Sequence, residues 1–272
     1  MFTPVQRPPM RSFLGQMELI YHIAVRSVRK THGNALISLL LNMFQTAMMI
    51  VGFYFTYAVL GLTTQRVRGD FILYIMSGIF LFITHIRAIA AVTSADGWTS
   101  PMMKHAPMNP IVSIAGAALG SLYIQVLSMI AVLAIYAMAF HPITIDQPVQ
   151  AFGMLLLAWF AGVAIGMIFR AAKPWQPELV TILTTVFQRA NMIASGKMFL
   201  ANSLTPKMLA MFSWNPLFHT IDQARGFTFA NYNPHFSSWT YPLYVSCVCL
   251  MIGLIGEFYT GQHASMSWDA GR

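Results

Sequence analysis

Long apolar segments alternate with short polar stretches along most of the chain. Six of these segments are long enough to cross roughly 30 Å of hydrocarbon as helices that rise about 1.5 Å per residue. We therefore predict an all-α membrane protein with six transmembrane helices. The predicted spans are Ala35–Leu60, Phe71–Val92, Ile111–Phe140, Ala151–Phe169, Leu179–Leu200 and Tyr241–Tyr259.

The connections between the spans encode no inserted soluble domain. We expect a cytoplasmic N-terminus over residues 1–34, one transmembrane domain over residues 35–260 and a cytoplasmic tail over residues 261–272. Two polar stretches of the transmembrane domain, residues 93–110 and residues 201–239, are longer than a simple reversal of direction needs. These two stretches are therefore the first places to look for function.

The segment before the first span, Phe13–Lys30, is amphipathic. Its apolar residues recur at helical spacing on one face, and polar and basic residues fall largely on the opposite face. Such a helix suits the cytoplasmic headgroup region of a membrane. Two interpretations stay open, a simple topology anchor or a mobile interfacial gate helix beside a transport pathway. The gate interpretation depends on Tyr21, Arg26, Arg29 and Lys30.

Residues 93–110 form the longest loop that we assign to the cytoplasm between spans. Connections between helices usually have about 2–8 residues, and the prolines and Gly97 in this loop break helices. We expect a short helix that contacts another protein, with an uncommitted solvated loop as the alternative. The candidate contact residues are Asp96, Trp98, Lys104 and His105.

A capped helix is predicted within residues 201–239. Asn215 is a good N-cap residue, and Pro216 needs no hydrogen-bond donor in the first helical position. We expect the helix to cover Leu217–Arg225 and to end at Gly226.

The same region is too short to hold two further full spans. A pair of short re-entrant helices before the last span fits its length and polarity, and an ordinary outer loop is the alternative. Leu217, Ile221 and Ala224 are expected to face apolar surroundings, while Asp222 and Arg225 have the spacing of an ion pair. The candidate residues of this region are Trp214, Asn215, Pro216, His219, Asp222 and Arg225.

Composition supports insertion into a membrane. Of the 272 residues, 57% are hydrophobic and 9% are charged, against about a quarter charged in a typical soluble domain. The net charge of +8 comes without a clustered basic domain, so no nucleic-acid partner is expected. With the N-terminus in the cytoplasm, ten of the 16 Lys and Arg residues fall on the inner side and five on the outer side. This excess favours both termini inside.

The chain carries no recognisable catalytic or metal-binding constellation. Its eight His residues lack metal-ligand spacing, and Cys247 and Cys249 point to different faces of a helix. A transporter driven by protons or sodium usually places carboxylates or ion sites near the midplane, but the eight acidic residues are dispersed and few lie in spans. Uphill transport would therefore draw its energy from a partner protein, and we expect no cofactor in this chain.

Arg189 falls well inside a predicted span. A charge at that depth normally faces a protein interior or a wet cavity, so a place near a transport path and a buried structural pair are both open. Aromatic residues collect in the outer half of the first span, where they either form an interface belt or stack on sugar rings. They include Phe53, Tyr54 and Tyr57.

Several stretches, taken in order, resemble the membrane subunit of type 2 ABC transporters, and specifically the exporters of capsular polysaccharide and related lipid-linked glycans. SWNPLFHTIDQARGFTFANY at residues 213–232 resembles the family signature after the fifth span. ASGKMFLANSL at residues 194–204 is similar to the segment that precedes it. Residues 74–98 together with residues 102–114 resemble the second span and its proline-containing loop. The start of the first span departs from the family pattern because it lacks a Trp and a Pro.

The resemblance implies a permease subunit of an ATP-driven exporter of a capsular polysaccharide or similar glycan, in the bacterial inner membrane. Two copies of the chain would form the pore, and two copies of a separate ATPase would bind ATP and Mg²⁺ on the cytoplasmic side. Residues 93–110 would contain the coupling helix, residues 13–30 the gate helix and residues 204–226 the re-entrant outer helices. Periplasmic and outer-membrane export proteins are further candidate partners.

Two other classes compete with glycan export. A permease of the same fold can move a lipid or a drug, because a fold does not fix its cargo. A six-span protein without transport activity, such as a membrane enzyme or a scaffold, is disfavoured by the missing catalytic cluster and by the ordered resemblance. A tunnel lined by aromatic residues would favour a glycan, and an apolar cleft open to the side would favour a lipid or a drug.

Overall fold

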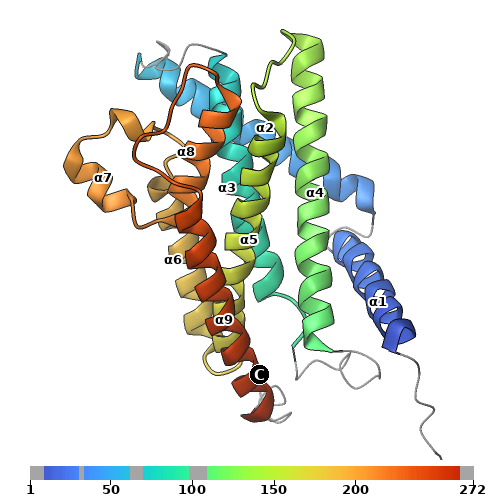
Figure 1. Cartoon of the computed structure of the whole chain (residues 1–272). Helices are drawn as coiled ribbons and strands as arrows, with labels where there is room; N and C mark the ends of the chain where they lie inside the picture. The colour runs from blue at the N-terminus through green and yellow to red at the C-terminus, as the bar shows by residue number, and fades with distance from the viewer. Residues whose placement is uncertain (1–8, 31–33, 62–69, 98–108, 264–272) are drawn as a thin grey trace, which may run out of the picture.

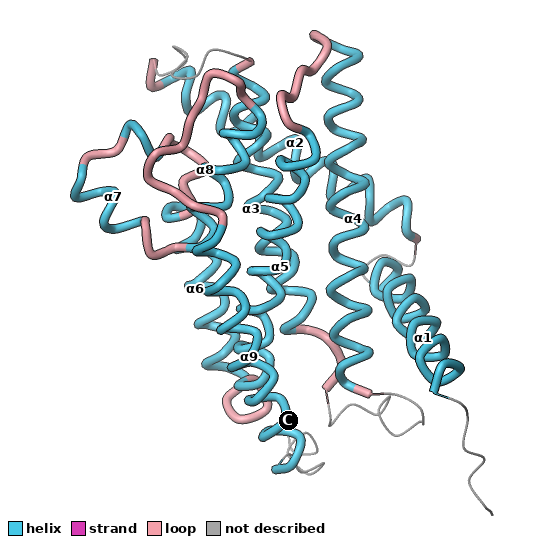
Figure 2. The backbone as a smooth tube through the Cα atoms, viewed as in Figure 1, coloured by secondary structure: helices cyan, strands magenta, loops and turns pink. Residues whose placement is uncertain are grey.

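The computed structural model of the chain describes residues 9–30, 34–61, 70–97 and 109–263, and within these ranges it contains helices and loops but no strand (Figures 1 and 2). The prediction of an all-α fold is confirmed for this part of the chain. The elements are α1 (Pro9–Lys30), α2 (Ala35–Val59), α3 (Phe71–Thr93), α4 (Pro110–Ala139), α5 (Pro148–Ala172), α6 (Pro177–Ala194), the 3₁₀ turn η2 (Ala201–Ser203), α7 (Pro206–Phe212), α8 (Pro216–Thr228) and α9 (Thr240–His263).

Five of the described helices, α2, α3, α4, α5 and α9, are long and apolar enough to cross a membrane. The chain is therefore a multi-pass membrane protein by length and composition. The fifth predicted span, Leu179–Leu200, is not among these five helices. Its helix, α6, has 18 residues and carries Glu178 and Arg189. We predicted that this helix reaches Leu200, but it ends at Ala194, because the chain turns at Gly196 with a left-handed φ of 73°.

Side-chain caps fix where several helices begin. Asn34, Asp70, Asn109 and Asn215 each accept a hydrogen bond from the amide two residues later, at 2.9–3.1 Å. Helices α4 to α8 start with a proline, which leaves one fewer amide to satisfy. Where a helix starts away from water, these caps remove unbonded amides that would be costly.

Helix α3 is the centre of the molecule. It packs against α5, α4, α8 and α2, and α5 in turn packs against α9 and α8. The core around α3 includes Ile79 and Ile83 of that helix, Leu155 of α5, and Leu217 and Ile221 of α8. Figure 1 shows α1 beside the lower half of α4. It also shows α7 and α8 in the upper half of the molecule, away from the C-terminal end of α9.

Glycines let the helices approach closely. A Cβ atom at Gly116 of α4 would lie 2.5 Å from Cγ2 of Ile23 in α1, and one at Gly162 of α5 would lie 2.5 Å from the carbonyl oxygen of His85 in α3. A Cβ atom at Gly253 of α9 would lie 2.5 Å from Cβ of Met167 in α5. Small residues at such crossings are typical of membrane helix pairs, and the sequence analysis did not single them out.

We expect Gly116→Ala to loosen α1 from α4, because the new methyl group overlaps a β-branched side chain and backbone. Overpacking of this kind costs typically about 1–3 kcal/mol. Thermal unfolding in detergent and tryptic cleavage after Arg26 would measure the effect. Gly153→Ala in α5 is the matched control, since nothing lies within 4 Å of a Cβ atom there, and equal behaviour of the two variants would contradict the packing.

Candidate functional site

A cavity of about 390 Å³ lies between α1, α2, α3 and α4, at the lower half of the molecule where α1 meets α4. Its walls carry polar side chains from all four helices and from the segment that follows α3. A polar cavity inside a bundle of apolar helices is the usual place for a substrate or ion pathway in a membrane protein. The polar lining residues are Arg26, Ser27, Ser38, Asn42, Gln45, Arg87, Ser94, Asp96, Ser113, Ser121 and Gln125.

An amide network fixes the wall between α2 and α4. The Asn42 side chain donates to the Ser128 hydroxyl at 2.9 Å, and Gln125 donates to the Asn42 carbonyl at 3.2 Å. In α2 the buried positions are Ser38, Asn42, Thr46 and Ile50, four residues apart. A polar stripe on one face of an apolar span is a signal that the sequence analysis missed.

The cavity has an excess of positive charge. Arg26 of α1 and Arg87 of α3 line it, and Asp96 is the acidic residue of the lining. One terminal nitrogen of Arg87 donates to the side-chain carbonyl of Gln45, which holds the guanidinium at the wall. Two guanidinium groups, several amides and several hydroxyls suit a ligand that is rich in oxygen and carries negative charge.

The predicted gate residues do not share one environment in the structure. Helix α1 includes the whole predicted amphipathic segment, but its residue Tyr21 is 65% exposed and is not part of the wall of this cavity. Arg26 does line the cavity. The side chains of Arg29 and Lys30 lie outside the described part of the chain. A gate role for α1 stays a prediction that rests on Arg26.

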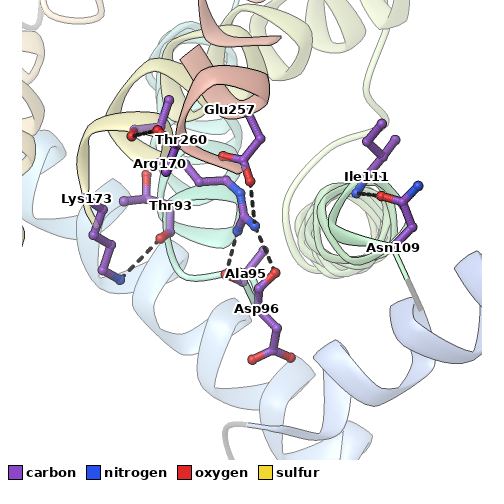
Figure 3. Close-up of polar contacts among 10 residues, drawn as sticks. Thr93, Ala95, Asp96, Asn109, Ile111, Arg170, Lys173, Glu257 and Thr260 are labelled. Carbon is purple, nitrogen blue, oxygen red and sulfur yellow. Dashed lines mark hydrogen bonds and ion pairs between the residues drawn. The ribbon is translucent and has the colours of Figure 1, made fainter. Parts of the chain in front are cut away.

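Of the predicted loop contacts, Asp96 lies in the described part of the chain, and Trp98, Lys104 and His105 lie outside it, as does the short helix expected there. The backbone carbonyl of Asp96 accepts a hydrogen bond from Arg170 of α5 at 2.8 Å. Figure 3 shows the Asp96 carboxylate pointing away from that guanidinium. The start of the loop is therefore attached to α5 by its backbone.

A second arginine organises the opposite end of the molecule. Arg225 of α8 is fully buried, and its guanidinium donates to the carbonyl oxygens of Gly196, Lys197 and Phe199 at 2.5–2.8 Å. The same group stacks on the Tyr74 ring of α3 at 4.2 Å. One side chain thus closes the turn after α6 and joins it to α8 and α3.

The predicted ion pair between Asp222 and Arg225 is wrong. Asp222 instead accepts from the hydroxyls of Tyr232 at 2.5 Å and Ser237 at 2.7 Å, while Arg225 is engaged with carbonyls. The predicted end of this helix is also wrong, because α8 continues past Gly226 to Thr228.

Other predictions for α8 are confirmed. Asn215 caps the helix, Pro216 occupies its first turn, and Leu217, Ile221 and Ala224 are buried in apolar surroundings. Trp214, just before the cap, is exposed, and its carbonyl accepts from the Tyr241 hydroxyl at 2.7 Å.

Two of the three predicted aromatic residues hold the turn after α6. The Lys197 ammonium lies 3.6 Å from the centre of the Phe82 ring and 4.8 Å from that of Phe53, and it has no hydrogen-bond partner among the described residues. The Tyr57 hydroxyl donates to the Met198 carbonyl, and Tyr54 is partly exposed beside Phe71.

Arg189 is exposed on α6, where only Val180 and Asn191 are buried. This position contradicts the interpretation of Arg189 as a buried structural pair within the chain. A place for Arg189 near a transport path stays a prediction.

No family model matches the chain, and no curated protein matches it. Among the described residues, no group of three or more His, Cys, Asp or Glu side chains could hold a metal ion.

We expect Arg225→Met to destabilise the protein strongly, since three carbonyls lose their donor. A buried polar group left without a partner costs about 1–3 kcal/mol, and the loss should appear as a large drop in the thermal unfolding temperature in detergent. Arg189→Met is the matched control, because an exposed substitution usually changes stability by less than about 0.5 kcal/mol. Similar melting of the two variants would contradict the role of Arg225.

His219 predicts a dependence of stability on pH. Its Nδ1 accepts from the Ser238 amide at 3.2 Å and its Nε2–H donates to the Ser213 carbonyl at 2.7 Å, which requires a neutral ring. Burial lowers the pKa of His219 below its ordinary value of 6.5. The stability that depends on the neutral ring is therefore fully present above pH 6.5 and is lost as the pH falls through the lowered pKa. Thermal unfolding between about pH 7.5 and pH 5 should have a smaller slope in His219→Asn, and equal slopes would contradict this assignment.

Proposed function

We propose that the chain is the membrane subunit of an ATP-driven exporter that moves a capsular polysaccharide or a similar glycan across the bacterial inner membrane. The observation that carries this proposal is the cationic, amide- and hydroxyl-rich cavity between the amphipathic helix α1 and the apolar helices α2, α3 and α4. Residues Ala95 and Asp96 line the same cavity, so it adjoins the loop in which we expect a coupling helix.

The chemistry of the cavity favours a glycan over an apolar cargo. Arg26 and Arg87 place two positive charges in its wall, and Asn42, Gln45 and Gln125 add amide groups. Acidic sugar or phosphate groups bind favourably beside such charges and sugar hydroxyls bond to amides, whereas an acyl chain or an apolar drug would displace water from the charged groups at a cost. Export of a lipid or a drug by the same fold is the less favoured alternative.

The outer half of the chain supports the re-entrant arrangement. Helices α7 and α8 have 7 and 13 residues, fewer than the roughly 20 that a span needs. Most of α8 is buried, and its first amides are capped by Asn215. Helix ends at membrane depth are tolerated where protein covers and caps them. In this arrangement α6 is the fifth of six spans in chain order, and α7 and α8 enter and leave on the outer side.

The proposed transporter contains two copies of this chain and a dimeric ATPase. Helix α6 is mostly exposed in the single chain, with Ile182, Val186 and Ile193 each more than half exposed. Such a surface needs lipid or a second subunit against it. The ATPase would bind ATP and Mg²⁺ and dock on the cytoplasmic side, where we place both termini.

The proposal is tested by purification and transport. The chain, expressed with a candidate partner ATPase subunit, should purify as a complex of two copies of each, and inverted vesicles that contain the complex should take up a lipid-linked glycan only when ATP is supplied. A chain that stays monomeric and retains no ATPase would overturn the proposal.

We expect Arg87→Gln and Arg26→Gln each to lower glycan export about tenfold or more, since each removes a charge-assisted contact of about 1.5–3 kcal/mol. Basal ATP hydrolysis should change little. Vesicle uptake and phosphate release would be measured in parallel. Lys207→Gln on the exposed surface of α7 is the control, and export that falls equally in the control would remove the cavity from the pathway.

A further inference from the structure

We infer that Arg170 and Glu257 act as a transmission bracket, which fixes the segment Thr93–Gly97 to α5 and α9 and thereby sets the floor of the polar cavity. The bracket consists of Arg170 and Lys173 of α5, Glu257 of α9 and the backbone of Thr93–Gly97. The structural part of this inference stands on contacts in the chain, and its part in transport rests on the proposed function.

The centre of the bracket is the Arg170 guanidinium. Its Nη1 donates to the Ala95 carbonyl at 2.5 Å and its Nη2 to the Asp96 carbonyl at 2.8 Å (Figure 3). Helix α3 has just ended at Thr93, so these carbonyls have no partner within a helix. The planar fork of an arginine matches two successive carbonyls in a way that a single ammonium group cannot.

Glu257 makes the buried position of Arg170 tolerable. The carboxylate oxygen lies 3.4 Å from Nη2, and the two side chains are 8% and 4% exposed. A buried charge needs an opposite charge and hydrogen bonds, and removing one partner leaves the other at a large cost. Glu257 therefore positions Arg170, and through it the Thr93–Gly97 segment depends on α9.

Helices α5 and α9 form one unit at this level. The Thr260 hydroxyl of α9 donates to the Ala171 carbonyl at 2.9 Å and accepts from the Trp175 indole at 3.0 Å. Lys173 adds a second contact to the end of α3, because its ammonium donates to the Thr93 carbonyl at 3.3 Å. A displacement of the segment must therefore break these contacts or move α5 and α9 with it.

The same short segment also forms part of the cavity wall. Ala95 and Asp96 line the cavity that contains Arg26 and Arg87, while their carbonyls bond to Arg170. A motion of the segment changes the cavity and the α5–α9 unit together. In the proposed exporter this links the position of the ATPase contact to the shape of the glycan site.

A labelling experiment on the full chain in vesicles tests the structural part. Ala95→Cys is introduced into a protein in which Cys247 and Cys249 are replaced by Ser, and the rate of its reaction with a charged methanethiosulfonate reagent is measured. Glu257→Gln should raise the rate at least about tenfold, because the segment opens locally. Glu178→Gln, an exposed carboxylate on α6, is the matched control and should leave the rate unchanged.

A second variant guards against simple misfolding. Arg170→Gln with Glu257→Gln removes both charges of the buried pair, so it should fold, yet it lacks the guanidinium fork and should also release the segment. Leu41→Cys on the α2 wall reports whether the cavity opens everywhere. Unchanged rates at Ala95→Cys, or equal increases at Leu41→Cys, overturn the bracket.

The transport part is tested in the complex with the ATPase. The double variant should hydrolyse ATP at a rate close to that of the wild type and export glycan at least about tenfold more slowly, because the two processes lose their link. Equal export by the double variant and the wild type overturns the transmission role. A wild-type chain that binds no ATPase and exports nothing overturns the proposed function, while the labelling rates still decide the bracket.

Discussion

Backbone carbonyls just beyond the end of a helix have no partner within that helix, and in this chain buried arginines supply the missing donors. Arg225 bonds to three carbonyls of the turn after α6, and Arg170 bonds to two carbonyls after α3. Each guanidinium is buried, so the loss of its hydrogen-bond partners would leave a desolvated charge without compensation. The positions of α8 and of the Thr93–Gly97 segment follow from this constraint.

Helix α3 lies between the two arginine centres. Near its start, the Arg225 guanidinium stacks on the Tyr74 ring. Just beyond its end, Arg170 donates hydrogen bonds to the backbone carbonyls of Ala95 and Asp96. Helix α1 is held by the close glycine contacts of α4, and α2 is held to α4 by the Asn42 network. The polar cavity lies between α1, α2, α3 and α4.

The sequence predicted the features that depend on neighbours along the chain. Asn215 and Pro216 mark the start of α8 because a cap needs only the next few residues, and the apolar runs predict five of the long helices. The partners of Asp222, Arg225 and Arg170 could not be predicted, because 10 to 87 residues separate the bonded pairs. Spacing on one helix suggested an ion pair, and longer-range contacts replaced it. The cavity was missed for the same reason, although the polar stripe of α2 was visible in the sequence.

The Arg225 contacts also bear on how the protein is made. All three acceptor carbonyls lie 26–29 residues before Arg225, so donor and acceptors leave the ribosome close together in time. The guanidinium can find them while α9 is still being synthesised. Because α8 packs against α3 and α5, which precede it in the chain, this short helix can pack on helices that have already been synthesised. The acceptor carbonyls of this basic residue, whose charge would otherwise oppose insertion, are thus synthesised before the residue itself.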